Sequence, residues 1–103
     1  MQDLTQDLWR AQLEGDDNAV ILDVRTDLEV EEGYIPNSKH MDVQNPPVFM
    51  EIAQELDSGK NYYVYCRSGS RSTQACMILG SLGIGNTYNL LGGFEEWTGE
   101  ITQ

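Results

Sequence analysis

A predicted strand, a loop and a predicted helix meet in the stretch Tyr62-Tyr63-Val64-Tyr65-Cys66-Arg67-Ser68-Gly69-Ser70-Arg71-Ser72. Residues 62–65 are rich in β-forming side chains and run directly into Cys66, which favours a strand that ends at the cysteine. Beyond the loop, apolar residues recur at helical spacing, at Ala75, Ile78, Leu79 and Leu82. The stretch therefore predicts a cysteine at the start of a tight loop between a strand and a helix.

Strands and helices alternate outward from this stretch in both directions. Runs that favour strands lie at residues 19–23, 39–43 and 87–91. Start and stop signals predict helices from the N-cap Thr5 to Gly15, from Asp27 to Glu32, from Pro46 to Ser58, and a short one carrying Phe94 and Trp97. The expected core-facing residues of the first are Leu8, Trp9 and Leu13, and the third has a helically spaced set at Val48, Ile52, Ala53 and Leu56. This order predicts an α/β fold with a doubly wound, mostly parallel sheet and helices on both faces.

Size and charge limit the possible functions. At 103 residues, the chain is expected to form one domain over residues 1–103. Its 17 acidic and 6 basic residues give a formal charge of -11, which would repel nucleic acid and anionic membranes. The first residues contain neither a basic nor an apolar run, so no signal peptide is indicated and a cytoplasmic protein is expected.

The few sulfur and imidazole side chains direct attention to thiol chemistry. Cys66, Cys76 and His40 are too few for a disulfide framework or an ordinary structural zinc site. No metal or cofactor is implied. Cys76 lies within the predicted helix that follows the loop and is expected to pack in the core, while His40 is expected at the surface on a different strand or turn.

The loop after Cys66 has the composition of an anion cradle. A tight loop that leads into a helix points several backbone N–H groups inward, and the helix dipole adds partial positive charge. Arg67 and Arg71 flank the small residues of this loop. A cysteine at the mouth of such a cradle should have a pKa below the ordinary value, so that its thiolate is favoured without a general base.

Four motifs together resemble the rhodanese family. They are Leu22-Asp23-Val24-Arg25, Gly33-Tyr34-Ile35-Pro36, residues 64–72 around Cys66, and Gly92-Gly93-Phe94-Glu95-Glu96-Trp97. The resemblance implies a parallel five-stranded sheet flanked by helices, and a catalytic cysteine at the start of the active-site loop. Four residues separate Cys66 from Arg71, which is similar to the sulfurtransferase branch, whereas related phosphatases and arsenate reductases have five.

The resemblance also implies roles for individual residues. Cys66 would attack the sulfane sulfur of thiosulfate or a persulfide donor. Cyanide or a thiol acceptor, with a cysteine of another protein among the candidates, would then remove that sulfur. The substrate-binding loop would be Arg67, Ser68, Gly69, Ser70 and Arg71, with Arg71 also bracing the loop. Asp23, Arg25, Glu29 and Ser72 would form a supporting shell beneath it. Strand capping and surface ion pairing are the competing interpretation of Asp23, Arg25 and Glu29, and the supporting role is favoured. Ser72 is expected to cap the helix rather than to touch substrate.

Three alternatives to sulfur transfer remain open at this stage. A small phosphatase or arsenate reductase on the same scaffold would need the longer loop. A non-catalytic rhodanese-like binding module would normally have lost the cysteine that this chain keeps. A thiol redox carrier would need Cys66 and Cys76 to reach disulfide geometry, with Cα atoms less than about 7 Å apart.

Overall fold

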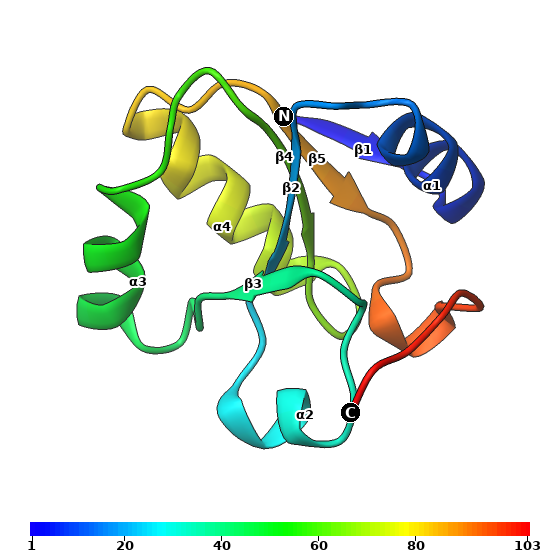
Figure 1. The fold of residues 1–103 in the computed structure, drawn as a ribbon. Helices are drawn as coiled ribbons and strands as arrows, with labels where there is room; N and C mark the ends of the chain where they lie inside the picture. Colours follow the sequence, from blue (N-terminus) through cyan, green and yellow to red (C-terminus); the bar gives the residue numbers. More distant parts are fainter.

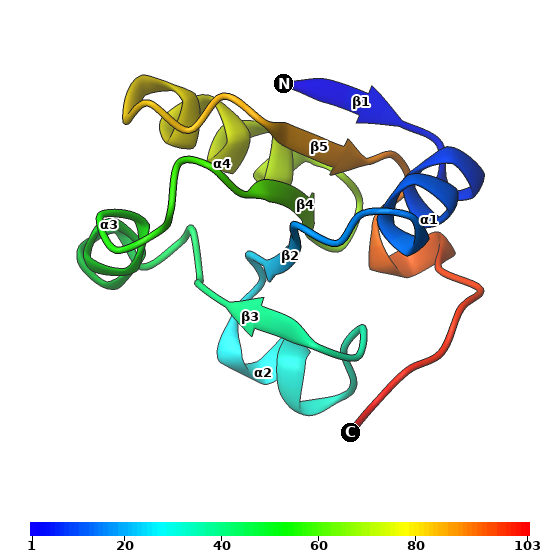
Figure 2. The ribbon, with the colours of Figure 1, turned by 45° about the horizontal axis from the view of Figure 1, so that its top comes forward.

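Helices and strands alternate along the whole chain in a computed structural model that describes residues 1–103. Figures 1 and 2 show the elements in two orientations. The strands are β1 (Gln2–Leu4), β2 (Ala19–Asp23), β3 (Ser38–His40), β4 (Asn61–Tyr65) and β5 (Thr87–Leu90). The helices are α1 (Gln6–Glu14), α2 (Asp27–Glu31), α3 (Pro46–Ala53), α4 (Ser70–Ser81) and the 3₁₀ helix η1 (Phe94–Glu96).

The five strands form one sheet in the order β1-β5-β4-β2-β3. Every strand pairing is parallel, so the carboxyl ends of all strands meet at one edge. The predicted doubly wound parallel sheet is confirmed. In such a sheet, ligands bind beyond the carboxyl ends of the strands. Asp23 at the end of β2 and Cys66 directly after β4 lie at this edge.

Both faces of the sheet are covered, as Figure 1 shows. Helices α3 and α4 lie on one face and α1 on the other. Alternation along β4 divides its side chains between two apolar clusters: Tyr62 and Val64 pack with α3 and α4, while Tyr63 and Tyr65 pack around Trp9 of α1. Burial on both faces explains why β4 reads as an unbroken run of β-forming residues.

The predicted apolar face of the first helix was partly wrong. Trp9 is fully buried and its indole N–H donates to the Tyr88 carbonyl at 3.1 Å, but Leu8 is 59% exposed. Trp9 and Leu13 are four residues apart and share a helix face, whereas Leu8 is turned away by about 100°. Thr5 is the N-cap and Gly15 the C-cap, as predicted.

Several predicted boundaries and faces also need correction. The third helix ends at Ala53 rather than near Ser58, because turns follow it, and its buried residues are Phe49 and Ala53, with Val48 exposed. Strand β3 stops at His40 rather than at residue 43. Leu82, expected on the apolar face of α4, is 41% exposed at the helix end. No helix combines the length and the apolar character that crossing a membrane requires.

Candidate active site

The Cys66 loop is held between α4 and the residues that follow β5. Gly69 is the N-cap of α4 and has φ 115°, a conformation that side chains other than glycine rarely adopt. The backbone N–H groups of Phe94 and Glu95 donate to the carbonyls of Cys66 and Arg67, both at 2.9 Å. At Gly93, a Cβ atom would lie 2.5 Å from the Arg67 carbonyl oxygen, so this close approach requires glycine and accounts for the Gly92-Gly93 motif.

Backbone amides and a hydroxyl converge on the Cys66 sulfur. The Gly69 N–H donates to Sγ at 3.0 Å, and the Ser72 hydroxyl lies 3.4 Å from it. Burial alone would raise the pKa of Cys66, but hydrogen bonds from the Ser72 hydroxyl and from the amides of Ser72, Gly69 and Ser68 outweigh it and lower the pKa below the ordinary value. The structure thus places the Gly69 amide and the Ser72 hydroxyl as donors around this sulfur.

The position of the thiol differs from the expectation in one respect. Cys66 has 0% of its surface exposed and does not lie at an open mouth. The loop residues Arg67, Ser68 and Ser70 are exposed, while Gly69 and Arg71 are partly buried. The sulfur thus lies below the surface, next to a loop whose residues are exposed or partly buried.

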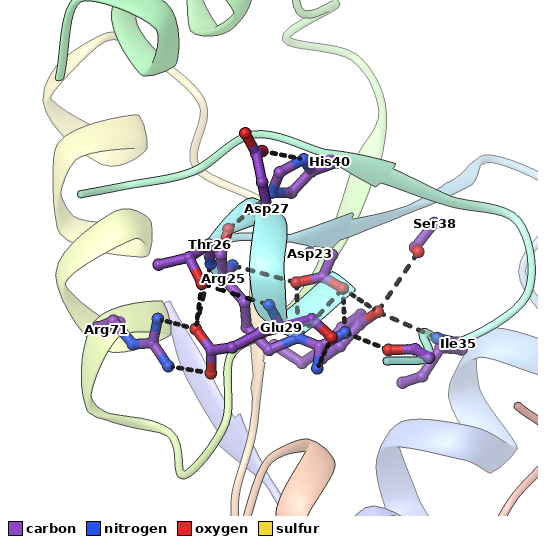
Figure 3. A network of polar contacts seen from close by, with 11 residues as sticks. Asp23, Arg25, Thr26, Asp27, Glu29, Ile35, Ser38, His40 and Arg71 are labelled. Carbon is purple, nitrogen blue, oxygen red and sulfur yellow. Dashed lines mark hydrogen bonds and ion pairs between the residues drawn. The ribbon is translucent and has the colours of Figure 1, made fainter. Parts of the chain in front are cut away.

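Arg71 connects the loop to α2 through Glu29. Its Nη1 and Nη2 donate to the two carboxylate oxygens of Glu29 at 2.7 and 2.8 Å (Figure 3). Thr26 and Glu29 also form a capping box at the start of α2. Hydrogen bonds from Arg71, followed by those from Thr26, lower the pKa of Glu29 to about 2 despite partial burial. The bidentate pair joins the first turns of two helices that are far apart in the sequence.

Asp23 and Arg25 form a second ion pair, which is connected to Glu29 because Arg25 Nη1 donates to the Glu29 carbonyl at 3.5 Å. Arg25 Nη2 lies 2.7 Å from Asp23 Oδ2, and the side chains are 3% and 1% exposed (Figure 3). The Tyr65 hydroxyl donates to the same carboxylate at 2.6 Å, and Arg25 also donates to the Gly33 carbonyl at 2.8 Å. The Arg25 guanidinium lies 4.2 Å from the centre of the Phe94 ring. This pair is buried structure, not surface ion pairing.

The prediction that Ser72 caps the helix was wrong. Gly69 is the N-cap, so Ser72 lies within the first turn of α4, where it faces inward and is fully buried. Its hydroxyl is 2.5 Å from Asn89 Oδ1, 3.0 Å from the Gly69 carbonyl and 3.4 Å from Cys66 Sγ. Because a hydroxyl has one hydrogen, these acceptors compete for it.

Asn89 is a site residue that sequence reasoning missed. It is 1% exposed on β5, and its side-chain amide donates to Asp3 at 2.9 Å and to Thr73 at 3.1 Å. Asparagine is uncommon within strands, so a polar residue inside the run Thr87–Leu90 was the available signal. Tyr65 was also missed as a site residue. Its register partner on β2 is Asp23, which places the two side chains on the same face.

Neither the remaining histidine nor the remaining cysteine forms a hydrogen bond with the Cys66 sulfur. His40 is partly buried rather than fully at the surface, with Nε2 2.6 Å from the Arg25 carbonyl oxygen. Cys76 is buried in α4 as expected, and burial raises its pKa to about 11. Both thiols are free, so the structure contains no disulfide of the kind that a redox carrier would use.

Fold and loop together define a parallel α/β domain in which a strand-to-helix loop encloses a single cysteine sulfur. The rhodanese-like domain family matches residues 5–100. The chain belongs to this family.

Individual relatives agree with the family match. The protein YtwF of Bacillus subtilis is 40% identical over 88% of this chain and 84% of its own length. The thiosulfate sulfurtransferase GlpE of Pseudomonas syringae is 34% identical over 85% of this chain and 80% of its own. The crystal structure of a rhodanese-like domain protein from Staphylococcus aureus superposes with a TM-score of 0.82 at 32% identity, covering 97% of this chain and 94% of that one.

Proposed function

We propose that this protein is a sulfurtransferase that carries sulfane sulfur as a persulfide on Cys66. The observation that carries the proposal is the set of donors around Sγ, with the Gly69 amide at 3.0 Å and the Ser72 hydroxyl at 3.4 Å. These groups lower the pKa of Cys66 and suit a sulfur anion. The likeness to the Pseudomonas syringae thiosulfate sulfurtransferase supports the same chemistry.

The proposed reaction is a double displacement. The Cys66 thiolate attacks the outer sulfur of the donor, a new S–S bond forms, and the donor's own bond to that sulfur breaks. With thiosulfate, sulfite leaves with the bonding electron pair. Amides of the loop stabilise the anionic sulfur, and each such charge-assisted bond is worth about 1.5–3 kcal/mol. An acceptor thiol or cyanide then takes the outer sulfur, and Cys66 leaves as a thiolate.

Donor treatment followed by intact-protein mass measurement tests this proposal. Thiosulfate or inorganic polysulfide should add about 32 Da, the mass of one sulfur atom, to the wild-type protein. Cys66→Ser should abolish both the adduct and thiosulfate:cyanide sulfurtransfer. Cys76→Ser is the matched control, because that thiol is buried in α4 and should be dispensable. Absence of an adduct on folded wild-type protein would overturn the proposal.

A further inference from the structure

The three arginines at the site differ in how far their charge is neutralised. Arg25 is paired with Asp23 and Arg71 with Glu29, both at 2.7 Å. Arg67 is exposed, and no carboxylate oxygen lies within 4.0 Å of it. Two of the three guanidinium groups therefore add little net positive charge, which leaves Arg67 as the single uncompensated cation of the loop.

A hollow of about 320 Å³ adjoins this loop. Its lining residues are Arg25, Glu29, Glu32, Arg67, Phe94 and Glu95. It borders the Cys66 loop because the amides of Phe94 and Glu95 donate to the carbonyls of Cys66 and Arg67.

The unpaired charges in the hollow are mainly negative. Glu32 and Glu95 are exposed and form no ion pair, so with Arg67 the wall carries two free negative charges and one positive. The chain as a whole has a formal charge of -11. The charge of the hollow and the charge of the whole chain both repel a dianionic donor that approaches Cys66, whereas they attract a cationic partner.

We propose, building on the proposed function, that the partner in sulfur exchange is a cysteine on a basic segment of another protein, which Glu32 and Glu95 select. That thiol attacks the outer sulfur of the Cys66 persulfide. The bond from this sulfur to Cys66 Sγ breaks, Cys66 leaves as a thiolate, and the partner cysteine becomes the persulfide. The acceptor's thiol proton goes to solvent, and no external oxidant or reductant is required.

A pair of cysteine peptides that differ only in flanking charge provides the test. Wild-type protein is loaded with sulfur from inorganic polysulfide, desalted, and mixed with a peptide whose cysteine is flanked by lysines or by glutamates. Loss of the adduct is followed by mass. At low ionic strength the lysine peptide should remove sulfur about tenfold faster, and the ratio should approach unity in about 0.5 M NaCl because salt screens exposed charges.

Variants of the hollow assign the effect to its residues. Flanking lysines also lower the peptide thiol's own pKa, so the ratio of the two rates is compared between proteins rather than either rate alone. The double variant Glu32→Gln, Glu95→Gln should lower the ratio about threefold or more. Glu14→Gln is the control, because Glu14 lines a different hollow that shares no residue with this one.

Each outcome bears on one of the two proposals. Loaded wild-type protein that reacts with both peptides at equal rates, or a ratio unchanged by the double variant, would overturn the selection of a basic partner while leaving sulfur transfer intact. Failure of the protein to accept sulfur from polysulfide would instead overturn the proposed function. A ratio that falls in the double variant and not in Glu14→Gln supports the inference.

Discussion

Cys66 and Cys76 are both buried, yet their pKa values move in opposite directions. Burial raises the pKa of both thiols, but only Cys66 has a cradle of amides and a hydroxyl that overcomes it. For Cys76, a hydrogen bond with the Thr87 side chain lowers the pKa by less than burial raises it, and the pKa is about 11. The opposite pKa shifts of these two buried thiols therefore depend on the donors around each sulfur rather than on exposure.

Iodoacetamide alkylation at a series of pH values tests this contrast. The thiolate is the reacting form, and its fraction rises as pH passes through the pKa. Because the pKa of Cys66 is lowered, its rate should level off at a lower pH than that of free cysteine, whereas Cys76 should stay nearly unmodified at neutral pH. Peptide mass mapping distinguishes the two sites, and equal modification of both at neutral pH would contradict the assignment.

Ser72→Ala should reduce the reactivity of Cys66 without removing it. The Ser72 hydroxyl is the largest of the hydrogen bonds that lower the pKa of Cys66, after the opposing effect of burial. Its loss should raise that pKa and reduce alkylation at pH 7 by about three- to tenfold, since one pKa unit is a factor of ten in ionisation. Ser81→Ala, at the exposed far end of the same helix, should leave the profile unchanged.

His40→Ala tests whether the reaction needs a general base. His40 contacts the Arg25 carbonyl and Asp27, and it has no hydrogen bond to Cys66. If the loop alone favours the thiolate, turnover in the thiosulfate:cyanide assay should stay within about twofold of wild type. A fall of about a hundredfold would show that the imidazole takes part in proton transfer.

What could be predicted about individual residues followed from local signals. A small, basic loop between a strand and a helix was enough to single out Cys66 as the candidate residue and to predict the lowered pKa of its thiol. Asn89 could not be found in this way, because its partners Asp3 and Thr73 lie 86 and 16 residues away. The bidentate contact between Arg71 and Glu29 likewise spans 42 residues, and only the family resemblance suggested that both belong to the site.

At the scale of elements, α2 and the start of α4 are joined by the Glu29–Arg71 pair. The pKa of Glu29 in the folded protein is about 2, below its ordinary value of 4.5. This pair therefore contributes stability that is fully present above the pKa of the unfolded chain and is lost as pH falls from about 4.5 to about 2. The pair is partly exposed, at 20% and 22%, so screening reduces its contribution.

Glu29→Gln should therefore destabilise the protein by about 1–2 kcal/mol at pH 7. The difference in the free energy of unfolding between the variant and the wild type should shrink as pH falls from 4.5 to 2, because the Glu29 carboxylate becomes protonated in this range. Urea unfolding at pH 7 and at about pH 3 measures both values. Glu31→Gln on the same helix is the control, because Glu31 is exposed and forms no ion pair. A difference that grows on acidification would contradict the assignment.

Elements with a clear apolar pattern or clear cap residues were predicted from the sequence. An element that depends on contacts with residues far away in the sequence was not. Strand β4 and helix α4 are predicted by their apolar residues on either side of the Cys66 loop. Helix α1 is predicted by its cap residues Thr5 and Gly15. Strand β1 has only three residues and no buried one, so nothing local marks it. It exists because Gln2–Leu4 pairs with β5 across the sheet.

At the scale of the whole molecule, acidic charge dominates a domain whose sheet is covered on both faces. Seventeen acidic residues stand against six basic ones, and the ion pairs at the site use two of those six, Arg25 and Arg71. Most of the remaining carboxylates therefore repel one another across the surface. Such repulsion opposes the compact state, because unfolding moves the charges apart.

Added salt should consequently stabilise the fold while slowing encounter with a basic partner. Screening weakens repulsion between exposed charges separated by more than about 8–10 Å, so raising NaCl from about 0.02 to 0.3 M should increase the melting temperature by roughly 2–5 °C at pH 7. KCl should give the same shift as NaCl, since the effect depends on ionic strength and not on a bound cation. A melting temperature that falls with salt would mean that ion pairs such as Glu29–Arg71 outweigh the net charge in setting the stability of this domain.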